Sequence, residues 1–124
     1  MQSLWFGAAA VVAALTFCVH TFIGGPRVAL PLLADKQLPR ASKWLNYYCW
    51  HVVTILLAAT TLSFSAVAIG WASRDIAWLL GGLSFLLSVL SIFVAVKAGI
   101  SPLRFPSTTL FALVALSTLG GALS

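Results

Sequence analysis

Four long apolar stretches constrain the fold of this chain more than any other feature. They cover residues 4–23, 44–71, 76–96 and 106–123, and none has an Asp, Glu, Lys or Arg in its interior. A helix needs about 20 apolar residues to cross the hydrocarbon core of a bilayer. The pattern therefore predicts an all-α fold, a membrane four-helix antiparallel bundle that forms a single transmembrane domain over residues 1–124.

The composition argues against an ordinary soluble domain. Hydrophobic residues make up 61% of the 124 residues and charged residues only 7%, whereas soluble domains carry about 25% charged residues. A net charge of +5 beside hydrophobic spans indicates contact with anionic lipid headgroups. We therefore expect the lipid bilayer as a partner, and no nucleic acid.

The basic residues are distributed unequally between the expected loops. Arg74, beside Asp75, is the only basic residue between the second and third spans. The positive-inside rule makes the opposite face cytoplasmic, so both termini are expected outside the cytoplasm, in a membrane such as the bacterial inner membrane. The residues expected to set this topology are Arg27, Lys36, Arg40, Lys43, Lys97 and Arg104.

The segment between the first two spans, residues 25–43, is expected to lie in the membrane interface. Gly24-Gly25-Pro26 should end the first helix, because Pro lacks an N–H and obstructs a regular helix. The apolar run 28–34 is too short to span and suggests a short interfacial helix broken by Pro31. Ser42 is expected to cap the second helix.

Small residues recur along the spans at steps of three and four. Such residues let membrane helices approach closely, so we expect them to mark packing faces. A polar track for water or a solute is the alternative for the serines. The third span carries Gly81, Ser84, Ser88, Ser91 and Ala95; the first carries Ala9, Ala13, Thr16, His20 and Gly24; and the second carries Ala58 and Ser65 below His51.

His20 and His51 are the only histidines and the main candidates for chemistry. They fall at similar depth on antiparallel helices, on stripes expected to face inward. Two imidazoles can bind haem b iron axially or hold copper, with Arg27, Lys43 and Arg104 available for haem propionates. Alternatively, each histidine only hydrogen-bonds a backbone carbonyl, a tyrosine or a headgroup.

Two Cys-x-His steps, Cys18 to His20 and Cys49 to His51, suggest a zinc site at first sight. Residues two apart on a helix point about 200° away from each other, so one ion cannot bind both without unwinding. We therefore expect the cysteines to be small, buried apolar side chains.

His20-Thr-Phe-Ile-Gly24-Gly25, followed by a basic residue, resembles a helix end in the CopD-like copper-resistance membrane families. The resemblance covers about ten residues, and Ile23 replaces the aromatic residue expected before the glycines. It implies haem or copper handling at His20.

The chain lacks the residue sets of common enzymes. No carboxylate lies in a span, and there is no phosphate-binding loop or metalloprotease motif. We expect a non-enzymatic accessory or assembly subunit of a larger membrane complex, which associates with other membrane subunits or with itself. The alternatives are a haem- or metal-binding electron-transfer or cofactor-handling protein using His20 and His51, and a small oligomeric channel or exporter.

Overall fold

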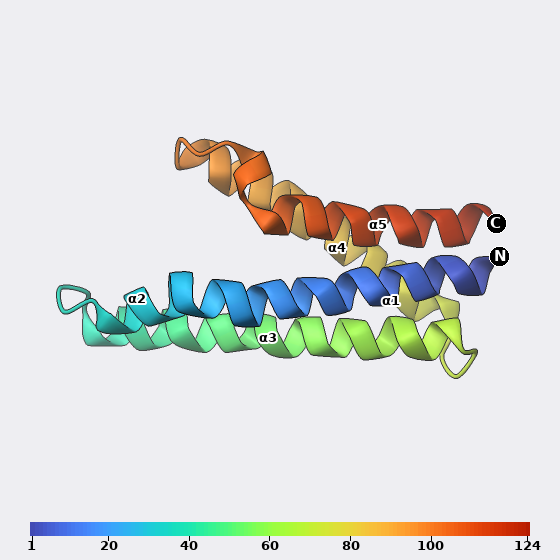
Figure 1. Cartoon of the computed structure of the whole chain (residues 1–124), viewed down its shortest axis with the longest axis horizontal. Coiled ribbons are helices and arrows are strands. Elements are labelled where there is room, and N and C mark those ends of the chain that lie inside the picture. The colour runs from blue at the N-terminus through green and yellow to red at the C-terminus, as the bar shows by residue number, and fades with distance from the viewer.

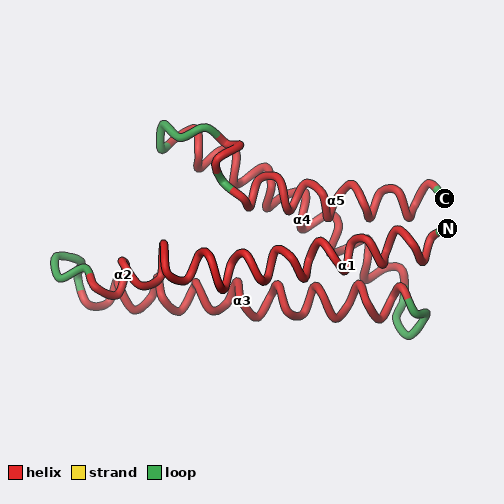
Figure 2. Tube along the Cα trace, in the orientation of Figure 1, coloured by secondary structure: helices red, strands yellow, loops and turns green.

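The computed structural model describes residues 1–124 and is entirely helical, without strands (Figures 1 and 2). Four of its helices are long and apolar enough to cross a membrane. In chain order the elements are α1 (Gln2–Cys18), the π-helix η1 (Val19–Ala29), α2 (Leu30–Ala34), α3 (Arg40–Ala68), α4 (Arg74–Lys97), the 3₁₀ turn η2 (Pro102–Arg104) and α5 (Pro106–Leu123).

The helices form two hairpins that meet at one end. The run α1–η1–α2 packs against α3, and α4 packs against α5. The hairpins join mainly through α1 and α5, whereas α3 and α4 touch only slightly. Figure 1 shows the hairpins together beside the N- and C-termini and diverging toward the opposite end. The arrangement is compatible with a four-helix bundle that is open at one end.

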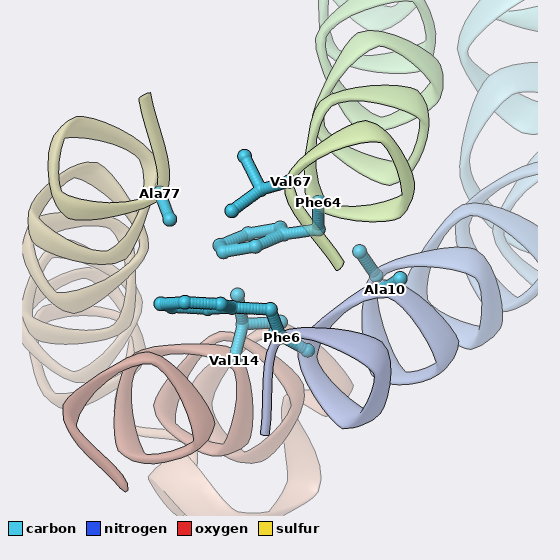
Figure 3. Close-up of a cluster of buried hydrophobic side chains, with 8 residues drawn as sticks. Phe6, Ala10, Phe64, Val67, Ala77 and Val114 are labelled. Atoms are coloured by element: carbon cyan, nitrogen blue, oxygen red, sulfur yellow. The ribbon is translucent and has the colours of Figure 1, made fainter. Parts of the chain in front are cut away.

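The buried apolar core lies near the closed end, where all four long helices contribute side chains. Figure 3 shows the rings of Phe6 and Phe64 between the helices. The helices approach closely there because α1 offers alanines: Ala9 and Ala13 are almost completely buried. The cluster is Phe6, Ala9, Ala10, Ala13, Phe64, Val67, Ala77 and Val114.

The first helix does not end at Gly24-Gly25-Pro26, so that expectation is wrong. The chain stays helical to Ala34, with η1 carrying it past the proline. Hydrogen bonds in this segment run over five residues, as from the Leu30 N–H to the Gly25 carbonyl. The wider turn relieves the clash between the Pro26 ring and the preceding turn that a regular α-helix would impose. The expected interfacial loop 25–43 shrinks to a short connection between α2 and α3.

The ends of α3 also differ from those expected. It begins at Arg40, after Pro39, so Ser42 lies inside the helix and does not cap it. It ends at Ala68, three residues before Trp71, because Gly70 adopts a φ of 80° and the Trp71 N–H bonds the Ala66 carbonyl. This left-handed glycine cap terminates the helix.

The end of α4 has the same kind of cap as the end of α3. Gly99 has a φ of 70°, and the Ile100 N–H bonds the Ala95 carbonyl. At its beginning, the Ser73 side chain accepts a hydrogen bond from the Asp75 N–H. In the turn at the closed end, local interactions therefore stop α3 and start α4.

Candidate binding cavity between the hairpins

His20 lies in η1 and faces α3. Its imidazole stacks on the Trp50 indole, with ring centroids 3.9 Å apart and an interplanar angle of 19°. Its Nε2 atom lies 3.1 Å from the Thr54 hydroxyl and 3.3 Å from the Trp50 carbonyl oxygen. The histidine thus has polar partners within the chain, of the kind named above as the alternative to a metal or haem.

His51 is placed differently. It is exposed, and its ring meets Tyr47 of the same helix edge-on, with centroids 4.6 Å apart. The buried face of α3 consists of Leu57, Thr60, Phe64 and Val67. The stripe of His51, Ala58 and Ser65 therefore lies beside the packing face, because α3 inserts large side chains against the alanines of α1.

The two histidines consequently contact different neighbours, and a shared haem or metal ligand stays a prediction. Cys18 and Cys49 are both exposed and free, so the expectation that they are buried is wrong, because each lies on a helix face that points away from the other helices. No group of three or more His, Cys, Asp or Glu side chains converges anywhere in the chain.

The small-residue seam of the third span is buried along its whole length. Gly81, Ser84, Ser88, Ser91 and Ala95 are all buried residues of α4, the helix that packs on α5. The Ser88 hydroxyl donates to the Thr108 carbonyl at 2.8 Å. Ser91 Oγ lies 2.7 Å from both Ser107 Oγ and Thr108 Oγ1. Serines on this seam therefore bond α5 directly, since a small side chain brings its hydroxyl within reach of the neighbouring helix.

The six basic residues expected to share one face lie at the open end, and they have different environments. Lys43 Nζ donates to the Leu33 carbonyl, which caps α2. The Nζ atom of Lys97 lies over the Phe93 ring, 5.8 Å from its centroid. Lys36 and Arg40 are exposed. Arg27 and Arg104, from opposite hairpins, line the same cavity.

This cavity is the interhairpin cavity, of about 420 Å³, which opens where the two hairpins diverge. η1 contributes His20, Gly24 and Arg27 to its wall, and α3 contributes Trp50. Its remaining walls are mostly apolar, with Arg104 and Ser107 from the second hairpin. The remaining lining residues are Thr16, Val19, Ile23, Val28, Val53, Leu57, Phe105, Pro106, Leu110 and Phe111.

A second concave region, the α4–α5 groove, lies on the outside of the second hairpin and measures about 500 Å³. Small residues form part of its lining: Gly81, Gly82, Ser88, Ala112 and Ala115. Bulky side chains flank them: Trp78, Phe85, Val89, Ile92, Leu116 and Leu119.

Sequence reasoning missed the contact between Gly24 and Trp50. A Cβ atom on Gly24 would lie 2.7 Å from Cη2 of Trp50, so any larger residue there would displace the indole that stacks on His20. The small-residue spacing of the first span places Gly24 one turn after His20 on a packing face, but it does not identify Trp50 as the partner. Thr21 beside His20 has a buried hydroxyl without a hydrogen-bond partner.

Comparison with protein-family models, with curated proteins and with solved structures finds no match for this chain. Any role of the interhairpin cavity or of the α4–α5 groove is therefore inferred from their lining residues and shape.

Proposed function

We propose that this chain is a small non-enzymatic polytopic membrane protein, an accessory or assembly subunit that docks a transmembrane helix of a partner subunit in the α4–α5 groove. The observation that carries the proposal is the open space beside Gly82, which lines that groove. Gly82 has no atom within 4 Å of the position of a Cβ, so the groove is open there to a close-packed neighbour.

The chemistry of the groove suits a helix. Membrane helices associate where small residues let backbones approach, because lipid removes the hydrophobic driving force. Gly82 and Ala115 provide such positions, and Phe85 and Leu116 are exposed side chains available to pack beside an incoming helix. All the lining residues of the groove come from α4 and α5, so α1 and α3 leave it open to a partner.

The proposed orientation follows the basic residues. The open end carries six of the seven Lys and Arg side chains, and Arg74 lies at the closed end with both termini. By the positive-inside rule, the open end faces the cytoplasm and the termini face the other side. The proposed location is a membrane such as the bacterial inner membrane.

The experiment is photo-crosslinking in native membranes from a photoreactive residue at Phe85. We expect adducts of defined mass larger than the monomer, each containing a second membrane polypeptide. Gly82→Leu should abolish them, because the leucine side chain would occupy the groove, and its Cβ meets no atom of the chain within 4 Å. Gly7→Leu is the matched control, since Gly7 also has open space around it but lies on α1.

A crosslinked pair of identical chains would identify self-association as the use of the groove. Adducts with lipid only, or adducts that survive Gly82→Leu, would contradict helix docking in the groove.

A further inference from the structure

We propose that the interhairpin cavity binds one anionic phospholipid, with its phosphate between Arg27 and Arg104 and an acyl chain along the apolar wall. This inference requires the membrane location proposed above and is independent of the α4–α5 groove. Three features of the cavity support it: two lining arginines, a mostly apolar lining and a position between the hairpins.

The two arginines lack a carboxylate partner in the chain. Asp35 accepts hydrogen bonds from the Gln37 and Leu38 N–H groups, and Asp75 is bonded to Ser73 at the closed end. Both acidic residues are therefore engaged in local turns. A guanidinium presents several donors in a planar fork that matches phosphate. Arg27 and Arg104 line the cavity from different hairpins and supply positive charge that a phosphate would balance.

The wall away from the arginines is apolar and extends along the helices. On α3 it runs from Trp50 to Leu57, which is roughly 10 Å at 1.5 Å per residue. On α5 it includes Leu110 and Phe111. A free phosphate would use none of this surface, whereas an acyl chain would cover it. The combination favours a lipid over a small soluble anion.

The position of the cavity between two hairpins distinguishes a lipid bound there from the lipids of the surrounding bilayer. Basic pockets between transmembrane helices on the cytoplasmic side are typical sites for anionic headgroups. α1 and η1 from the first hairpin and η2 and α5 from the second all line the cavity. A lipid held there would bridge hairpins that otherwise diverge at this end (Figure 1).

The experiment is a lipid titration of the purified full chain in an uncharged detergent, with bound lipid counted by native mass spectrometry. Phosphatidylglycerol should bind as one retained molecule, and phosphatidylcholine with the same chains should bind at least several-fold more weakly. Inorganic phosphate, which lacks the acyl chain, should not compete at equal concentration. Equal retention of both lipids, or competition by phosphate, would overturn the assignment.

Substitutions of the arginines test whether the lipid binds in the interhairpin cavity. Arg27→Gln and Arg104→Gln should each weaken phosphatidylglycerol binding roughly tenfold, since each removes charge-assisted hydrogen bonds. Arg40→Gln is the matched control, because Arg40 is exposed at the same end and does not line the cavity. An equal loss in Arg40→Gln would show general surface attraction and contradict the site.

Two more variants test the position of the acyl chain and separate lipid binding from helix docking. Leu110→Trp fills the apolar part and should weaken phosphatidylglycerol binding while both arginines remain. Gly82→Leu should leave lipid binding unchanged, because it alters only the α4–α5 groove. Failure of helix docking and failure of lipid binding are therefore distinguished by separate variants. Unchanged lipid binding in Leu110→Trp would place the acyl chain outside the cavity.

Discussion

Trp50 of α3 fits against the backbone of Gly24 in η1, where a Cβ atom would come within 2.7 Å of its indole. The same indole stacks on His20, one turn earlier in η1. Gly24, Trp50 and His20 thus form one packing unit that joins the π-helix to α3. The π-helix that continues past the Gly-Gly-Pro sequence is thus packed directly against α3.

Gly24→Ala should displace the Trp50 ring and destabilise the protein by about 1–3 kcal/mol, the usual cost of overpacking. The measurement is thermal unfolding in detergent together with tryptophan fluorescence. Gly25→Ala is the control, since the adjacent glycine has no atom within 4 Å of a Cβ position. Equal effects of the two substitutions would show that chain flexibility, and not the indole contact, requires glycine.

Gly81 and Gly82 provide a matched pair on α4. A Cβ on Gly81 would lie 2.6 Å from Cγ2 of Thr118, whereas a Cβ on Gly82 meets nothing within 4 Å. Gly81→Ala should therefore cost about 1–3 kcal/mol. Gly82→Ala should be neutral or stabilising by up to about 1 kcal/mol, since alanine favours helix. Unfolding in a denaturing detergent measures both, and a stabilising Gly81→Ala would contradict the close α4–α5 contact.

Ser88→Leu should separate α4 from α5. The residue is buried and its hydroxyl bonds the Thr108 carbonyl, so leucine loses a hydrogen bond and overpacks the seam, at about 1–3 kcal/mol. Ser88→Ala should cost only about 0.5–1.5 kcal/mol, because it removes the hydrogen bond alone. Val94→Leu on the exposed side of α4 is the control. Melting temperatures in one detergent rank the three variants, and an unchanged value for Ser88→Leu would place the seam against lipid.

The two histidines should differ in their contribution to stability. His20→Ala removes a ring stack and a polar contact with Thr54, and should cost about 1–3 kcal/mol. His51→Ala removes an exposed ring with one edge contact to Tyr47, and should cost less. Under the paired-histidine hypothesis, the purified protein would instead show a haem Soret band or bound copper that either substitution abolishes. Visible absorption and metal analysis of the wild type and both variants separate these outcomes.

The orientation can be tested by cysteine labelling in intact bacterial cells. Cys18 and Cys49 are exposed and free, so both are first replaced by alanine. A cysteine at Gln37, in the α2–α3 connection, should react with an impermeant thiol reagent only after the membrane is opened. A cysteine at Trp71, in the turn at the opposite end, should react in intact cells. The reverse pattern would invert the proposed topology.

Local sequence alone determined the helical content of this chain. Four uncharged apolar stretches predicted four long helices, and the structure has four helices that are long and apolar enough to span a membrane. Spacing by three and four predicted that Gly81, Ser84, Ser88, Ser91 and Ala95 share one face of α4, and all five are buried. These properties follow from periodicity and hydropathy, which act within one helix.

The candidate site depended on tertiary structure. Pro26 predicted a break by a local rule, yet packing of Trp50 on Gly24 accompanies a continuous π-helix there. The face of His51 was inferred from nearby small residues, but Leu57 and Phe64 occupy the packing face of α3. Arg27 and Arg104 are far apart in sequence and line one cavity only because the fold brings the two hairpins together. Each of these outcomes is set by contacts between segments distant in the chain, which no local pattern encodes.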